Sequence, residues 1–227
     1  MQLSRRHALL GGAALAVAAR VPTATAATPP ASRPAPAFYR FKLGDFEITA
    51  LYDGIWNRPL DATFVRNAPF ADVQQALADN FLPTDKLPLP FTAVLVNTGA
   101  KLVLIDTGTA GKMSPVAGSL IANLRAAGVE PAMIDTILIS HFHPDHINGI
   151  KTKDNALVFP NAEIKVPAPE WSYWMEANEA STVPDYAKGV FLNARRVFGD
   201  IGKQVTRFAP DAEVAPGIMS IPAFGHT

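Results

Sequence analysis

One short segment limits what this chain can fold into. An apolar run at residues 134–139 leads directly into the sequence His-Phe-His-Pro-Asp-His at residues 141–146. The apolar run is typical of a buried strand. Side chains alternate along an extended chain, so His141 and His143 should point to the same side where the strand ends. Because loops beyond strand ends expose functional groups in α/β sheets, the segment predicts a sheet edge that carries imidazole and carboxylate groups.

The distribution of histidine indicates a metal site. Imidazole nitrogen and carboxylate oxygen are usual ligands of catalytic zinc. The chain has five histidines and no cysteine, so any site must be built from nitrogen and oxygen. His7 lies in a segment that we expect to be removed, and His226 follows an apolar strand close to the last residue. A solvated, idle histidine-rich loop is the alternative, but the density of ligand-type residues at 141–146 favours metal binding.

The second half of the same segment predicts a second ion. Asp145 and His146 follow as the chain turns, into a helix expected around residues 147–150. They should therefore point away from the direction shared by His141 and His143, and could hold another metal nearby.

The N-terminal residues have the features of an export signal. Arg5 and Arg6 form a twin-arginine pair, residues 8–19 are apolar, and residues 24–26 form an A-x-A cleavage site. The apolar run is shorter than the roughly 20 residues that span a bilayer. Residues 1–26 are therefore predicted to be a twin-arginine-type signal peptide, with a Sec signal as the alternative, and the protein is expected to be exported to the periplasm.

Composition indicates the bounds of the folded domain and the kind of partner that it can bind. Residues 27–37 form a proline- and alanine-rich linker, and residues 38–227 are expected to form one domain. Removing residues 1–26 takes away three arginines and no acid, which leaves 17 basic and 20 acidic residues. A protein with this slight excess of negative charge has no electrostatic attraction to nucleic acid or to an acidic membrane. A small-molecule substrate is the expected partner.

Periodicity and turn residues predict an order of strands first and then alternating helices and strands, which favours a layered α/β sandwich. The expected strands are at residues 38–43, 46–51, 91–97, 101–106, 134–139, 161–166, 205–208 and 218–221. The expected helices are at residues 71–81, from Ser114-Pro115 to Ala127, at 169–179 and at 184–198.

Three motifs in order resemble the metallo-β-lactamase fold superfamily. They are Leu-Ile-Asp-Thr-Gly at residues 104–108, His-x-His-x-Asp-His at 141–146 and Gly-His-Thr at 225–227. The segments at residues 39–54, 96–99 and 159–162 are similar to the branch that contains methyl parathion hydrolase. The resemblance implies a four-layer αβ/βα sandwich and a zinc-dependent hydrolase.

The resemblance also implies roles for individual residues. His141, His143 and His226 would hold the first metal, while Asp145 and His146 would contribute to the second of two Zn²⁺ ions. Asp106 would order the ligand loop without binding metal itself. The alternative is that Asp106 only forms the turn Asp-Thr-Gly. Superfamily members place a bridging aspartate and a last histidine after the Gly-His-Thr motif, so we expect the chain to lack its C-terminal part and the second half of the sandwich.

The chemistry that follows is hydrolysis. A zinc-bound hydroxide would attack an ester, lactone or phosphotriester, and Asp145 would orient it or pass a proton to the leaving group. Hydrolysis of β-lactams and a catalytically incomplete metal-binding fragment are the alternatives. Trp171 and Trp174, three residues apart on an expected helix, either form an aromatic roof over the metal or pack that helix onto the sheet.

Overall fold

The computed structural model describes residues 35–227 apart from 177–182 and 184, and residues 36–227 belong to one compact unit. None of the helices in this described part is long and apolar enough to cross a membrane. Some predictions fall wholly or partly outside the described residues: the signal peptide at 1–26, the linker at 27–37, and the facing ends of the helices at 169–179 and 184–198.

A seven-stranded sheet forms the centre, and its strands lie in chain order. The first four strands pair antiparallel, and the last four pair in parallel, so the sheet is mixed. The strands are β1 Phe38–Leu43, β2 Phe46–Pro59, β3 Lys86–Asn97, β4 Leu102–Ile105, β5 Thr136–Leu138, β6 Glu163–Pro167 and β7 Val205–Phe208. This arrangement confirms the predicted α/β class.

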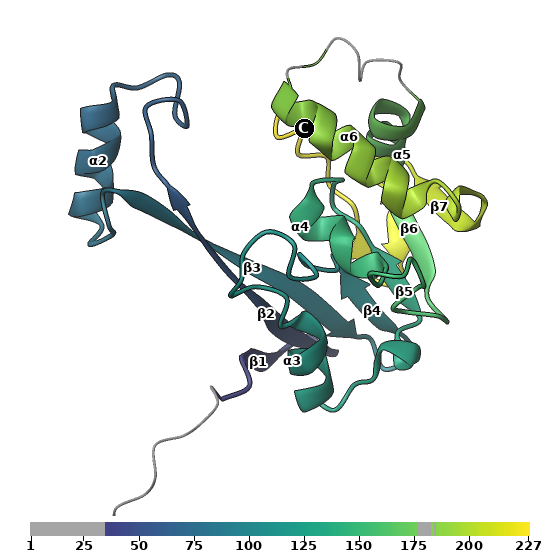
Figure 1. Cartoon of the computed structure of the whole chain (residues 1–227). Helices are drawn as coiled ribbons and strands as arrows, with labels where there is room; N and C mark the ends of the chain where they lie inside the picture. Colours follow the sequence, from purple (N-terminus) through teal and green to yellow (C-terminus); the bar gives the residue numbers. More distant parts are fainter. Residues whose placement is uncertain (1–34, 177–182, 184) are drawn as a thin grey trace, which may run out of the picture. The chain divides into compact units, whose positions relative to one another are not determined.

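Both faces of the central strands are covered. Leu104 of β4 and Ile137 of β5 share a buried cluster with residues of the helices α3 (Leu120–Ala126) and α6 (Asp185–Phe198). Their neighbours Val103 and Leu138 belong to a second cluster with β8 (Glu213–Ala215) and β9 (Ile218–Met219), which form a separate two-stranded sheet. Figure 1 shows α6 on the same side of the molecule as the parallel strands β5, β6 and β7. Covering on both faces explains why these strands are continuous apolar runs.

The helix predicted to start at Ser114-Pro115 is wrong at its N-terminal end. The carbonyl oxygen of Ser114 accepts the N–H of Ala117, which closes only one turn. Gly118 then has a φ of +96°, a left-handed conformation that interrupts a helix. Helix α3 begins only at Leu120, whose N–H donates to the carboxylate of Asp53 at 2.9 Å. The stop predicted at Ala127 agrees with the structure.

Other differences concern short elements. Helix α4 (Pro144–Ile147) precedes the helix expected at 147–150, which is instead the 3-10 turn η2 (Asn148–Ile150). Strand β5 is shorter than the apolar run that predicts it, and the sequence pattern misses the three-residue strand β8. The other helical elements of the described residues are α2 Phe70–Asp79, η1 Pro131–Met133, α5 Ala168–Trp171, the π-turn η3 Ser172–Glu176 and η5 Gly202–Gln204.

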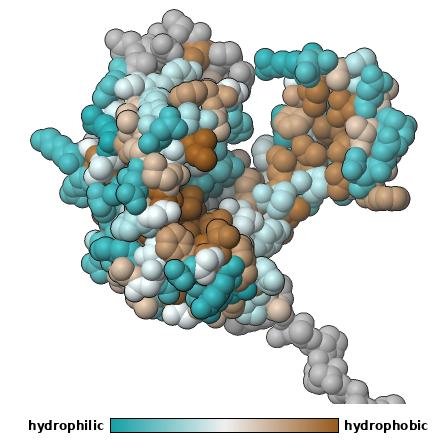
Figure 2. Space-filling view, turned by 180° about the vertical axis from the view of Figure 1, so that it is seen from behind, coloured by the Kyte–Doolittle hydropathy of each residue, from teal (hydrophilic) through white to brown (hydrophobic). Residues whose placement is uncertain are grey.

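Strands β2 and β3 form a long hairpin that extends to the pair Pro59 and Lys86, well past the residues of β3 that pair with β4. Helix α2 lies in the segment that connects β2 to β3 (Figure 1). Phe81 after α2 is 97% exposed, and Phe64 and Leu82 are also exposed. Figure 2 shows apolar surface on this part of the chain. Helix α2 ends before the predicted residue 81 because Phe81 has a left-handed φ of +58°.

A close approach of backbones joins the turn after β4 to the turn after α4. The N–H of Thr107 donates to the carbonyl of His146 at 2.8 Å, and the N–H of Gly149 donates to the carbonyl of Gly108 at 3.3 Å. A Cβ at position 149 would overlap the carbonyl oxygen of Thr107. Position 149 therefore requires glycine for space.

We expect Gly149→Ala to lower the free energy of unfolding by about 1–3 kcal/mol, because overpacking forces the two turns apart. Gly189→Ala is the matched control. Gly189 lies on an exposed position of α6 with no atom within 4 Å of a Cβ built there. Because alanine favours helix, Gly189→Ala should raise the same free energy by about 0.5–1 kcal/mol. Urea denaturation measures both values, and equal stability of the two variants would contradict the close approach.

Candidate metal centre

The ligand loop begins where β5 ends. Phe142 is fully buried, and its ring stacks on Phe198 with the ring centroids 4.6 Å apart. His141 and His143 flank Phe142, and their rings lie 4.7 Å apart, edge to face. The chain then turns into α4, with His143 at the N-cap and Pro144 at the first helical position. The buried phenylalanine thus fixes the loop so that both histidines face the same space, as the alternation predicted.

Three imidazole nitrogens converge at this place. Nδ1 of His143 lies 3.1 Å from Nε2 of His141 and 3.1 Å from Nε2 of His226. One nitrogen from each ring lies within 4.8 Å of the others. Four ligands at about 2.0–2.1 Å from a tetrahedral zinc ion lie about 3.3–3.4 Å from one another. The all-nitrogen donor set and its spacing therefore fit a zinc ion.

The protonation of the histidines also suits a metal. Burial, together with the neighbouring His146, lowers the pKa of His141 to about 3. Burial and His226 lower the pKa of His143 below its usual value. Both rings are therefore neutral at pH 7, and each has a lone pair with which to bind a cation.

Asp145 and His146 lie beside the three histidines as a separate pair. Nε2 of His146 lies 3.2 Å from Oδ2 of Asp145, and the His146 ring lies 3.9 Å from the ring of His141. Burial alone would lower the pKa of His146, but hydrogen bonds to Asp106 and Asp145 outweigh it and raise that pKa to about 9. Within the described residues, the cluster that could hold a metal contains only the three histidines. A second ion at Asp145 and His146 stays a prediction.

Asp106 orders the ligand loop, which favours the first of its two interpretations. Its carboxylate accepts the N–H and the hydroxyl of Ser140, both at 2.8 Å. It also lies 2.8 Å from Nδ1 of His146. The Ser140 hydroxyl in turn lies 3.0 Å from Nδ1 of His141. These contacts hold Nδ1 of both rings, while Nε2 of His141 faces His143 and Nε2 of His146 lies against Asp145.

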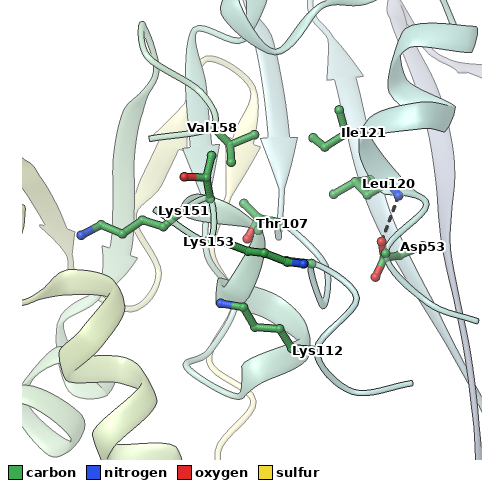
Figure 3. Close-up of a pocket in the computed structure, with 12 residues that line it drawn as sticks. Asp53, Thr107, Lys112, Leu120, Ile121, Lys151, Lys153 and Val158 are labelled. Atoms are coloured by element: carbon green, nitrogen blue, oxygen red, sulfur yellow. Dashed lines mark hydrogen bonds between the residues drawn. The ribbon is translucent and has the colours of Figure 1, made fainter. Parts of the chain in front are cut away.

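Sequence reasoning missed Asp53, a fully buried carboxylate of β2. Its oxygens accept the N–H and hydroxyl of Thr109 at 2.9 and 2.6 Å, besides the N–H of Leu120. Asp53 thereby holds Thr109 in the turn after Asp106, whose own carboxylate binds the ligand loop. An acidic residue inside an apolar strand pattern was the available signal. Figure 3 shows the Asp53–Leu120 bond in a pocket that Lys112 and Lys153 also line.

A different pocket adjoins the candidate site. Asp106, Asp145 and His146 line one part of it. Residues 90–93 of β3, which include Pro90 and Phe91, line the other part. This pocket offers a substrate an apolar wall next to the acidic side chains, whereas the pocket of Figure 3 contains none of the histidines.

Trp171 and Trp174 take part in packing. Both are buried, and Trp171 lies edge to face with Phe142 at 6.4 Å. Trp174 also packs on Phe191 at 4.5 Å. One side of the Trp174 ring nevertheless lies 6.1 Å from the ring of His143. The packing interpretation therefore holds for both residues, and only Trp174 also reaches the candidate site.

The mixed sheet and the histidines at its edge define a candidate metal centre in an α/β fold, and comparison with known proteins agrees with that class. Residues 88–226 match the metallo-beta-lactamase superfamily, and the chain belongs to that superfamily. The finer assignment to the branch containing methyl parathion hydrolase stays a prediction.

Solved structures give the same fold. The chain is 28% identical to AbOPH, a hydrolase in the beta lactamase superfamily, with a TM-score of 0.71 over 80% of this chain and 64% of that one. It is 29% identical to AidC, a dizinc quorum-quenching lactonase, with a TM-score of 0.72 over 79% of this chain and 63% of that one. A probable metal-dependent hydrolase from Staphylococcus aureus shares the fold with a TM-score of 0.61. It is 23% identical, over 78% of this chain and 64% of that one. The chain thus spans less than two thirds of each structure's length.

We expect Asp106→Asn to weaken zinc binding by about 10–100-fold, as changes of a ligand's hydrogen-bond partner do. The amide nitrogen would donate to Ser140 and to Nδ1 of His146, which reverses the hydrogen bonds through which Asp106 now orients these two residues. Competition with a chromophoric chelator measures the affinity. The matched control is Asp154→Asn at an exposed carboxylate. Equal affinities of the two variants would show that Asp106 has no part in positioning the ligands.

Proposed function

We propose that this protein is a zinc-dependent hydrolase that acts on an ester, a lactone or a phosphotriester. The observation that carries the proposal is the convergence of Nε2 of His141, Nδ1 of His143 and Nε2 of His226. Three histidines that leave a fourth position open are a recognised arrangement of catalytic zinc. A zinc ion held by these residues would supply hydroxide at neutral pH, because zinc lowers the pKa of bound water from about 15.7 to about 7.

The chain's own groups support this chemistry. Hydrogen bonding to His146 outweighs the effect of burial and lowers the pKa of the Asp145 carboxyl, so Asp145 is ionised at neutral pH. It lines the pocket beside the three histidines and can orient a nucleophile or carry a proton to a leaving group. Phe91 and Pro90 form an apolar wall of the same pocket, which suits the carbon chain or aromatic group of a neutral ester.

The substrate class is also supported by the relatives. AidC is described as a dizinc quorum-quenching lactonase, and AbOPH as a hydrolase. A lactone, a carboxylic ester and a phosphotriester share an electrophilic centre that carries an oxygen leaving group. Cleavage of a β-lactam, which has a nitrogen leaving group, is an alternative outcome of the test.

The competing function is metal binding without catalysis. In the described part of the chain the converging ligand-type residues are three histidines, and a second ion at Asp145 and His146 stays a prediction. The first site has its three histidines, so it can be tested separately from the second.

We further propose that the protein is exported, which rests on the twin-arginine pattern of residues 1–26 alone. Immunodetection of the processed chain in the periplasmic fraction would support export. A chain that keeps residues 1–26 in the cytoplasm would overturn it.

The hydrolase proposal predicts that the zinc-loaded protein cleaves at least one of four chromogenic probes: an aryl ester, a thiolactone, an aryl phosphotriester or a cephalosporin. Chelation should abolish cleavage, and added zinc should restore it. His143→Ala should bind no zinc and show no activity, because two imidazoles rarely retain the metal at a three-ligand site. Asp154→Asn serves as the control with unchanged activity.

Two results would count against the proposal in different ways. Bound zinc without cleavage of any probe would favour the metal-binding alternative. A protein that binds no zinc, as measured by elemental analysis after dialysis, would refute the metal site itself.

A further inference from the structure

Glu170 of α5 joins three separate parts of the candidate site. Its Oε2 accepts the backbone N–H of Phe142 at 2.8 Å and the indole N–H of Trp174 at 2.9 Å. Its Oε1 accepts the hydroxyl of Thr227. The side chain is only partly exposed, and all three partners donate to it. One carboxylate therefore accepts three hydrogen bonds, two from distant segments and one from the adjoining turn η3.

The partners of Glu170 are neighbours of the histidines. Phe142 lies between His141 and His143, and Thr227 directly follows His226. The two segments that supply the three converging nitrogens are thus tied to the same carboxylate. Their separation of 83 residues, between His143 and His226, means that local chain geometry cannot set the distance between them.

The ligand loop needs such a partner. Strand β5 ends at Leu138, so the N–H of Phe142 has no strand partner in the sheet. The Phe142 ring anchors one side of the peptide in the core, and Glu170 binds its N–H. Side chain and backbone are then both fixed, which sets the directions of the two flanking imidazoles.

Trp174 extends the same set of contacts. Its ring lies 6.1 Å from the ring of His143, edge to face, and its N–H is held by Glu170. A buried indole N–H needs an acceptor, and Glu170 supplies one. The Glu170 carboxylate thus also holds the ring of Trp174 next to His143, the histidine whose Nδ1 lies between the nitrogens of His141 and His226.

We infer that Glu170 is a positioning residue for the first metal: through hydrogen bonds it sets the spacing of His141, His143 and His226. The inference rests on the metal-dependent function proposed above. Glu170 does not itself belong to the group of ligand-type residues that converge in the described part of the chain. Its effect on the metal is therefore indirect, through Phe142, Thr227 and Trp174.

The test compares zinc affinity in variants of the full chain, measured by competition with a chromophoric chelator. Glu170→Ala removes all three hydrogen bonds and should weaken zinc binding by about 10–100-fold. Glu170→Gln should keep most of the wild-type affinity. The glutamine oxygen can accept from Phe142 and Trp174, and the amide N–H can donate to the Thr227 hydroxyl. Glu176→Ala, on the following turn, is the matched control and should leave zinc affinity unchanged, because the contacts of Glu176 with described residues are those with Ser172 and Arg207, neither of which is a ligand.

A second variant keeps the inference testable if Glu170→Ala does not fold. Thr227→Val keeps the shape of the side chain and removes only the hydroxyl that ties the His226 segment to Glu170. Loss of one hydrogen bond to a carboxylate should weaken zinc binding by about two- to tenfold. Urea denaturation of the metal-free variants separates a general loss of stability from a specific loss of affinity.

Each outcome is decisive. Wild-type affinity in folded Glu170→Ala, or in Thr227→Val, would overturn the inference. A Glu170→Gln variant as weak as Glu170→Ala would show that the residue acts through its charge, which also overturns it. Failure of the wild-type chain to bind zinc would instead refute the proposed function, so the two failures are distinguishable.

Discussion

The candidate site depends on the contact between the turn after β4 and the loop after β5. The Asp106 carboxylate at the end of β4 binds the backbone and hydroxyl of Ser140, and it holds the ring of His146. The Thr107 backbone binds the carbonyl of His146 from the same turn. Because β4 and β5 are parallel neighbours, their ends meet at one edge of the sheet. The pairing of two strands therefore brings the ligand loop to its orienting carboxylate.

Much of this arrangement could be predicted from the sequence. The apolar run at residues 134–139 predicts the buried strand β5, and the alternation around Phe142 places His141 and His143 on one side. What these predictions share is local information: a side-chain period or a spacing of a few residues. The resemblance implies the ordering role of Asp106, and the contacts of its carboxylate with Ser140 favour that role over turn formation alone.

Residues that act over long sequence distances could not be predicted in this way. Asp53 caps α3 from β2, and Glu170 binds Phe142 and Thr227, so the partners of both carboxylates lie far away in the sequence. The start of α3 was misplaced for the same reason. Ser114 and Pro115 are a favourable helix start, but the tertiary contact with Asp53 and the conformation of Gly118 select Leu120 instead. Buried carboxylates with backbone donors are where sequence patterns were least informative.

Because His143 and His226 lie far apart along the chain, an ion bound by both would also affect the stability of the fold. An ion shared by these residues is a cross-link that closes a loop of 83 residues, and this loop contains β6, β7 and α6. A link across so long a loop removes much of the freedom of the unfolded chain. Metal binding would therefore stabilise the strands and the helix enclosed by this loop more than the strands that precede it.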